Sequence, residues 1–184
     1  LTEKDSTVLG SLGNFISHGL VNLESLENHV LGEESKTRIL ELLTNLNYKS
    51  DEAQILDHFK YLIRTFFQYD RLTISLNWDV GVNSVIKLVD GIEDEFMVKT
   101  EFPTHGTLHG LPISSSKPIQ SKNWKKAHHN LSRFNSSEEE SEFLSVLGVP
   151  ILVEGTSIGS LFLERMTEEN YSKSDRQNLE LIGR

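Results

Sequence analysis

Seven side chains suited to binding a small molecule lie in or beside an irregular stretch of the chain, residues 103–142. They combine aromatic rings with a few polar or charged groups, which is the usual make-up of a ligand pocket: His105, Thr107, His109, Trp124, Arg133, Phe134 and Phe143. We expect a bound molecule to lie between this stretch and a β-sheet. The alternative interpretation is that Trp124, Phe134 and Phe143 only fill the core beneath it.

Metal binding and catalysis are not predicted from the other patterns. His105 and His109 are four residues apart, but in a glycine-containing loop rather than on a helix. Glu138, Glu139 and Glu140 are consecutive, so their carboxylates would diverge around a helix instead of converging. No Ser/His/Asp set and no phosphate-binding glycine loop stands out. We therefore expect no metal site and no enzyme activity.

The composition excludes further chemistry. The chain has no cysteine, so disulfides, thiolate zinc sites, iron–sulfur clusters and cysteine nucleophiles cannot form within it. A net charge of −9 argues against nucleic acid as a partner, because phosphate contacts need a clustered basic face. No stretch approaches the roughly 20 apolar residues that cross a membrane, and no secretory signal is visible. We expect a cytoplasmic location and no membrane contact.

Residues 6–31 are predicted to form a long helix with a coiled-coil-like seam. Its apolar positions alternate spacings of three and four, with a gap at Gly19: Leu9, Leu12, Ile16, Leu23, Leu26 and Val30. Such a seam favours pairing with a second copy, so we expect a homodimer through the terminal helices. Packing of this helix on its own domain is the alternative. A further helical stretch extends to about Leu46.

The rest of the chain reads as one helix, three strands, the irregular stretch, a hairpin and a closing helix. The first helix runs to about Phe67, and the last begins near Asp175. The strands are predicted over Arg71–Trp78, Ser84–Val89 and Glu95–Phe102 from alternation and turn residues.

The hairpin is predicted within Phe143–Met166. Two nearly continuous apolar runs flank a polar turn, Glu154–Ser157, and both look like central strands. Pro150 has no N–H to donate to a sheet, so it belongs at a strand start or an unpaired position. Gly159 is expected to allow a helix or a ligand to approach the strand closely.

This order of elements predicts an α+β fold, an antiparallel sheet of about five or six strands with helices on one face, preceded by a long helix. The chain resembles the GAF domain family, whose fold is of this GAF/PAS-like kind. Segments 144–151 and 155–163 resemble the family signature S-x-L-x-V-P-L … G-x-x-I-G-V-L-x-L. Segment 171–175 is similar to the aromatic-(Ser/Thr)-x-x-Asp that opens its last helix. Segment 110–119 resembles the part before the family's lid.

The resemblance implies two parts, connecting or signalling helices over residues 1–46 and a sensor domain over residues 47–184 with a truncated closing helix. Residues 171–184 also line up with residues 1–14, with Asp175 matching Asp5. A tandem array of such domains predicts this repetition. Leu1–Asp5 would then be the tail of a preceding copy.

The resemblance further implies a non-catalytic sensory or regulatory module. Such a module binds a small molecule and relays its state through terminal helices to an output domain, such as a histidine kinase or a cyclic-dinucleotide enzyme. The alternative is a ligand-free dimerisation and coupling domain, in which side chains fill the pocket.

The residues leave the identity of any cofactor open. A covalently attached bilin is excluded, because phytochrome-like members hold it through cysteine, and methionine-sulfoxide reductases of this fold need catalytic cysteines. Members that bind cyclic nucleotides carry an Asn-Lys-x-Phe-Asp-Glu type of pattern. Asn170, Lys173 and Asp175 match that pattern only in part.

Overall fold

The computed structural model describes residues 52–79, 82–93, 96–135 and 141–184 of the chain. Its helices are α3 (Glu52–Phe66), α4 (Leu111–Ser115), α5 (Trp124–Ala127) and α6 (Lys173–Ile182). Its strands are β1 (Arg71–Asp79), β2 (Asn83–Gly91), β3 (Glu101–Pro103), β4 (Ile119–Ser121), β5 (Ser145–Val153) and β6 (Thr156–Arg165).

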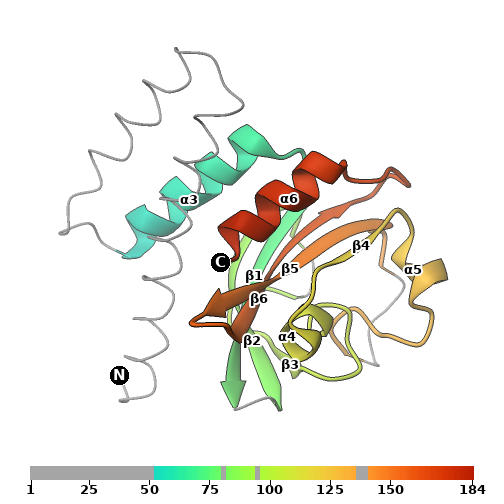
Figure 1. Cartoon of the computed structure of the whole chain (residues 1–184), viewed down its shortest axis with the longest axis horizontal. Helices are drawn as coiled ribbons and strands as arrows, with labels where there is room; N and C mark the ends of the chain where they lie inside the picture. The colour runs from blue at the N-terminus through green and yellow to red at the C-terminus, as the bar shows by residue number, and fades with distance from the viewer. Residues whose placement is uncertain (1–51, 80–81, 94–95, 136–140) are drawn as a thin grey trace.

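The strands form one six-stranded antiparallel sheet in the order β3-β2-β1-β6-β5-β4. The longer helices α3 and α6 lie side by side on one face, and the short helices α4 and α5 lie with the connecting loops on the other (Figure 1). We call these the helix face and the lid face, and we call residues 104–135 the lid. The predicted α+β fold is confirmed, with the two long helices grouped on one face as expected.

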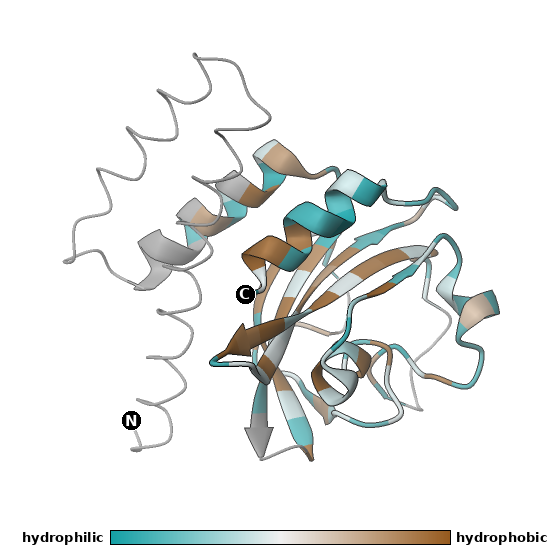
Figure 2. Cartoon of the chain, viewed as in Figure 1, coloured by the Kyte–Doolittle hydropathy of each residue, from teal (hydrophilic) through white to brown (hydrophobic). Residues whose placement is uncertain are grey.

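Alternation along the strands supplies the apolar core on the helix face. Leu72, Ile74 and Leu76 of β1 project there together with Leu161 and Leu163 of β6, and all are buried. The two helices cover them with residues at helical spacing: Phe59 and Ile63 of α3 and Leu179 and Ile182 of α6. Figure 2 shows hydrophobic residues along the central strands and on the C-terminal part of α6. Burial of these side chains holds the long helices against the sheet.

The predicted hairpin is present as β5 and β6. Its turn contains only Glu154 (φ 50°) and Gly155 (φ 79°), which is the backbone of a two-residue type I′ turn, so β6 already begins at Thr156. Pro150 lies beyond Gly148, where the pairing of β5 with β4 ends, as its missing N–H requires.

One expectation about the hairpin is wrong. What lies close to Gly159 is the neighbouring strand β1 and not a helix. A Cβ added there would lie 2.2 Å from the backbone oxygen of Ser75 on the paired strand β1. The glycine is needed for strand pairing.

The start of α6 explains the motif at residues 171–175. Ser172 accepts a hydrogen bond from the N–H of Asp175 at 3.0 Å, and Asp175 accepts one from the N–H of Ser172 at 2.7 Å. This reciprocal pair is a capping box, and it satisfies backbone donors that a helix start leaves unpaired. The preceding Tyr171 is 2% exposed and belongs to the helix-face core.

The predicted third strand over Glu95–Phe102 is wrong in extent. The structure has a strand only at Glu101–Pro103. Lys99 adopts a φ of 78°, which lies outside the strand region and ends the extended backbone. The lid, in turn, contains more regular structure than its sequence indicates, because β4 adds a sixth strand and α4 and α5 add short helices.

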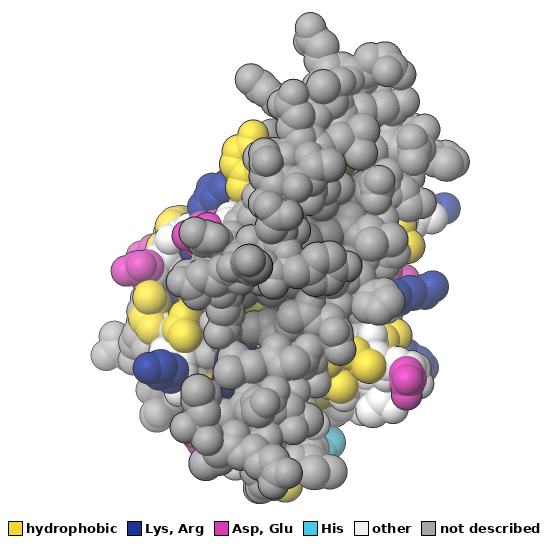
Figure 3. All heavy atoms as spheres, turned by 90° about the vertical axis from the view of Figure 1, so that its left-hand side faces the viewer, with side chains coloured by type: hydrophobic (Ala, Val, Ile, Leu, Met, Phe, Trp, Pro, Cys, Tyr) yellow, Lys and Arg dark blue, Asp and Glu magenta, His cyan; other side chains and the backbone are white. Residues whose placement is uncertain are grey.

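The predicted helices over residues 1–46, with their dimer seam, lie outside the described residues. Figure 3 shows one side of the molecule, where the described side chains that are visible mix hydrophobic, basic and acidic groups. In the described part of the chain, no helix is both long and apolar enough to cross a membrane.

Candidate functional site

The two faces of the sheet differ sharply in chemistry although the same strands supply both. On β1, Arg71, Thr73 and Ser75 alternate with the core leucines and isoleucine and project to the lid face, and each is at most 1% exposed. On β6, Ser160 and Glu164 do the same. We call these five residues the buried polar layer. It lies in the middle of the sheet, beneath the lid.

Glu164 is the centre of a buried charged cluster. Arg133, from the lid, donates to both of its carboxylate oxygens, from Nε to Oε1 and from Nη2 to Oε2, each at 2.7 Å. The Nε of Arg71 lies 3.7 Å from Oε2. The three side chains are 0–2% exposed. A bidentate guanidinium–carboxylate pair of this kind fixes both groups in orientation.

Arg71 also holds the segment that follows β2. Its guanidinium donates to the backbone oxygens of Ile92, at 3.2 Å, and of Phe96. Its Nε donates to Thr73 Oγ1 at 3.2 Å. The arginine thus joins the sheet to the loop between β2 and β3.

His109 is stacked between two phenylalanine rings. Its imidazole lies 4.0 Å from the ring centroid of Phe134 and 4.0 Å from that of Phe162, with interplanar angles of 28° and 23°. Its Nε2 lies 3.3 Å from Glu164 Oε1 without meeting hydrogen-bond geometry. Both ring nitrogens are therefore buried without a hydrogen-bond partner among the described residues, which is uncommon and unfavourable in proteins.

The environment moves the pKa values of both titratable groups. Burial lowers the pKa of His109 to about 4, an effect that the arginine charges add to and Glu164 opposes. Burial by itself would raise the pKa of Glu164, but the charge and hydrogen bonds of Arg133 outweigh it and hold that pKa well below its usual range. At neutral pH the cluster thus holds a carboxylate and a neutral imidazole.

Four of the seven predicted ligand residues lie at this cluster. Besides His109 and Arg133, Phe134 packs on both of them, and Phe143 faces the Arg133 guanidinium at 4.6 Å. The other three lie elsewhere. Trp124 packs in a neighbouring cluster with Val146 and Phe162 and donates from Nε1 to the Phe143 oxygen at 2.9 Å.

Thr107 and His105 do not lie at the charged cluster. Thr107 is buried and shapes its own loop, donating to the Pro103 oxygen at 2.7 Å and accepting from the N–H of Gly110 at 3.2 Å. His105 is exposed, whereas His109 is fully buried, so the two histidines do not face a common point. No group of three or more metal-ligating side chains occurs among residues 52–79, 82–93, 96–135 and 141–184.

Sequence reasoning missed Arg71, Glu164 and Phe162. A signal was available for Glu164, because it directly follows the apolar run Leu161–Leu163 in the buried part of the strand. A charged residue at such a position usually has a buried partner. Nothing local in the sequence identifies that partner as Arg133, 31 residues away.

The lid is attached to the loop that leads into α6. Asn123 Nδ2 donates to Glu168 Oε2 at 3.1 Å, and Lys126 Nζ donates to Glu168 Oε1 at 3.3 Å. Gln120 Nε2 donates to the backbone oxygen of Tyr171 at 2.6 Å. These hydrogen bonds connect β4 and α5 to the residues immediately before the last helix.

A protein-family model described as GAF domain matches residues 51–184 of the chain. No curated protein matches the chain in sequence.

Solved structures share the fold at low sequence identity. The GAF domain of an Acinetobacter phosphoenolpyruvate-protein phosphotransferase is 16% identical, with a TM-score of 0.65 over 83% of this chain and 90% of that one. The corresponding domain from Coxiella burnetii is 15% identical, with a TM-score of 0.63 over 91% and 89%. Free methionine-R-sulfoxide reductase from Neisseria meningitidis, solved with its substrate, is 14% identical, with a TM-score of 0.61 over 84% and 87%.

Proposed function

The chain belongs to the GAF domain family of regulatory modules, and we propose that it is a non-catalytic sensor that binds a small polar molecule between sheet and lid. The binding state passes through the terminal helices to an output domain, such as a histidine kinase or a cyclic-dinucleotide enzyme. The homodimer predicted from the seam over residues 6–31 belongs to the same proposal.

The observation that carries the proposal is the buried polar layer. Burial of ionised groups costs several kcal/mol per ion before pairing, by order of magnitude, and apolar replacements are often neutral or stabilising. The helix face demonstrates that these strands accept leucine and isoleucine at alternate positions. Stability therefore does not explain the polar groups on the lid face. Recognition of a polar ligand explains a buried polar layer beneath a lid.

Ser75 is the best candidate for direct ligand contact in that layer. Its hydroxyl is buried and has no hydrogen-bond partner in the part of the chain that the structure describes. Its neighbour across the strands, Ser160, donates to the backbone oxygen of His109 at 2.9 Å. A ligand that donates to or accepts from Ser75 satisfies a group that is otherwise left unpaired.

The route to the output domain is supported by the bonds between the lid and the loop before α6. A ligand that moves the lid also moves Glu168 and Tyr171, because Asn123, Lys126 and Gln120 hold them. Tyr171 immediately precedes the capping box, so its displacement shifts the start of α6. A ligand that binds one lid position more tightly than the other therefore favours one of two positions of α6.

A thermal-shift screen tests the proposal. Amino acids, organic acids, nucleotides and heterocycles are added singly to the 184-residue chain. A true ligand raises the unfolding temperature in a concentration-dependent manner, because it binds only the folded state. The Ser75→Ala variant removes the unpaired hydroxyl without breaking a hydrogen bond, so it should unfold at an unchanged temperature yet respond less to the ligand.

A second candidate function, a ligand-free dimerisation and coupling domain, is favoured by the His109 stack. The imidazole occupies the space between Phe134 and Phe162, so side chains take the place of a ligand there. On this alternative the screen gives no response, and Ser75→Ala changes nothing. Catalysis is not part of either proposal: with no cysteine in the chain, thiol chemistry is impossible, and a turnover assay with methionine sulfoxide should give no product.

A further inference from the structure

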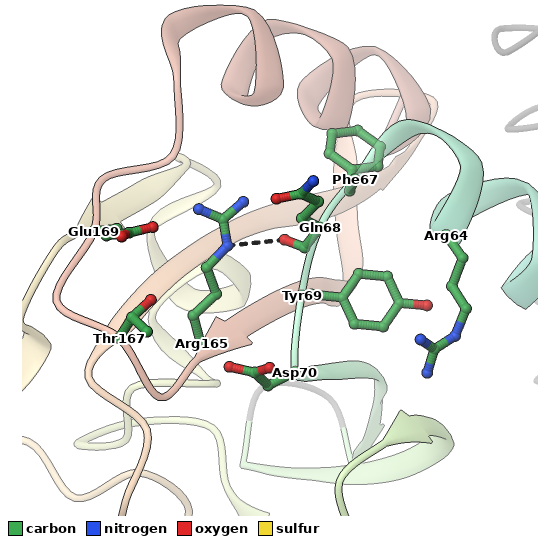
Figure 4. Close-up of a pocket in the computed structure, with 8 residues that line it drawn as sticks. All are labelled: Arg64, Phe67, Gln68, Tyr69, Asp70, Arg165, Thr167 and Glu169. Atoms are coloured by element: carbon green, nitrogen blue, oxygen red, sulfur yellow. Dashed lines mark hydrogen bonds between the residues drawn. The ribbon is translucent and has the colours of Figure 1, made fainter.

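A hollow of about 390 Å³ lies at the junction of the two long helices, away from the lid (Figure 4). Its lining comes from the end of α3, the linker to β1, the end of β6 and the loop to α6. We call it the junction hollow; the residues used below are Phe67, Tyr69, Asp70, Arg165 and Glu169. Its volume is in the range of sites that hold small molecules.

The outer end of the Arg165 guanidinium group faces the hollow. Its Nε donates to the backbone oxygen of Gln68 at 2.9 Å, the dashed line in Figure 4, and its guanidinium carbon lies 4.1 Å from the ring centroid of Tyr171. In the described part of the chain, its two Nη groups donate no hydrogen bond. The arginine is thereby held in place from two sides while its outer donors stay available for an anion.

Two carboxylates line the same hollow without pairing with that arginine. Asp70 uses Oδ2 to accept the N–H of Met166 at 2.7 Å. Glu169, from the loop before α6, makes no hydrogen bond or ion pair with any described residue. Figure 4 shows the Glu169 carboxylate and the Arg165 guanidinium on the same side of the hollow. The Arg165 guanidinium and the two carboxylates line one hollow without pairing with each other. This arrangement suits a ligand that carries both a negative and a positive charge.

We infer that the junction hollow binds a small zwitterion of the α-amino-acid type. Its carboxylate would accept from the Nη groups of Arg165, and its ammonium group would donate to Glu169 and Asp70. Tyr69, which is half-buried, provides aromatic surface for an apolar side chain, and Phe67 lines the hollow as a buried residue. Charge-assisted hydrogen bonds at both ends distinguish a zwitterion from an acid or an amine alone.

The location gives such a ligand a consequence for signalling. Arg165 already connects the linker after α3, through Gln68, to Tyr171, two residues before α6. A molecule that bridges Arg165 and Glu169 would tighten that connection between the two helices. The site is separate from the one between sheet and lid, so it stands or falls independently of the proposed sensor site.

The test is titration of the 184-residue chain with L-valine and two half-ligands, isovalerate, which lacks the ammonium group, and isobutylamine, which lacks the carboxylate. Amide NMR spectra locate the response. We expect saturable shifts at the amides of residues 68–70 and 167–169 with L-valine, and binding at least about tenfold weaker with either half-ligand, since loss of one charged hydrogen bond is worth that much.

Two variants and a control decide the assignment. Glu169→Gln should weaken L-valine binding about tenfold without changing the unfolding temperature, and Arg165→Met should abolish binding. Glu154→Gln, at the exposed hairpin turn, should leave binding unchanged. The inference is overturned if L-valine shifts none of these amides, if isovalerate binds as tightly as L-valine, or if the shifts fall on the lid instead.

Discussion

Arg133 and Glu164, 31 residues apart in sequence, meet through two hydrogen bonds of 2.7 Å in a position where the arginine is 2% exposed and the glutamate is not exposed at all. One belongs to the lid and the other to a central strand of the sheet. Their pairing therefore connects the two layers that enclose the proposed sensor site.

Replacement of Glu164 by glutamine should destabilise the fold strongly. The substitution keeps the shape but leaves two buried guanidinium groups without the carboxylate that faces them. Loss of one partner of a buried pair costs about 3–5 kcal/mol. Urea unfolding followed by circular dichroism measures this difference.

The control for that measurement is Glu180→Gln, which breaks the i,i+4 pair with Arg176 on the surface of α6. It should cost well below about 1 kcal/mol, as exposed pairs do. If Glu164→Gln is too unstable to fold, the double variant Arg133→Met/Glu164→Leu should recover the part of the loss that comes from Arg133, whereas Arg71 stays buried with only its bonds to backbone oxygens and Thr73. Equal, small effects for Glu164→Gln and Glu180→Gln would contradict the buried pairing.

Stability should fall as the pH is lowered from 7 toward 4, because of His109. Its pKa is about 4 in the folded chain against an ordinary value of 6.5, so the unfolded chain binds a proton first. The contribution is complete above about pH 6.5 and is lost as the pH approaches 4, on the order of 3 kcal/mol in total. Glu164, whose pKa is held low, adds a further loss only below about pH 4.5.

Unfolding midpoints measured between pH 7 and pH 5 test this dependence. The His109→Leu variant should show a flatter profile than the wild type over that range. His105→Gln, at an exposed histidine, should leave the profile as it is. A wild-type profile with no slope above pH 5 would mean that His109 is not held neutral by burial.

Loss of Glu168 should separate the lid from the loop before α6. Glu168→Gln weakens the bonds to Asn123 and Lys126, both of which lower the pKa of this carboxyl group. We expect faster amide hydrogen exchange at residues 123–127 and 171–175, with the global unfolding midpoint unchanged. Glu142→Gln, at an exposed residue between the lid and β5, is the matched control. Unchanged amide hydrogen exchange at residues 123–127 and 171–175 would contradict the proposed route from the lid to α6.

The seam over residues 6–31 should make the chain a dimer. Ile16→Asp and Leu23→Asp place charges on the predicted seam and should shift the mass measured by light scattering from dimer to monomer. Ser17→Asp, on the same predicted helix but off the seam, should leave the dimer intact. A wild-type chain that is monomeric at high concentration would count heavily against signalling through paired helices.

The parts of the fold that could be predicted are those with local causes. The hairpin at Glu154–Gly155 and the capping box at Ser172 and Asp175 are set by neighbouring residues, so their sequences identify them. Strand β4 has three residues, too few to create a periodic pattern, and its place is decided by pairing with β5. No residue near Lys99 indicates a turn strongly enough to outweigh the alternating apolar pattern of Glu95–Phe102.

The site could be predicted only in part, for a related reason. Aromatic and polar residues in and beside an irregular stretch predicted a group of seven, of which His109, Arg133, Phe134 and Phe143 lie together at the charged cluster. Their partners on the sheet, Arg71 and Glu164, come from strands whose pairing is a tertiary property. Which of His105 and His109 is buried likewise depends on how the lid packs on the sheet. The four-residue spacing of the two histidines does not determine it.

Calorimetric titration of the strongest thermal-shift hit into the wild type and Ser75→Ala tests whether a ligand binds between sheet and lid. We expect saturable binding to the wild type and binding about tenfold weaker to the variant, whose unfolding temperature without ligand equals that of the wild type. Identical binding by both proteins, or no saturable heat with any hit, would contradict it and leave the ligand-free coupling domain as the function.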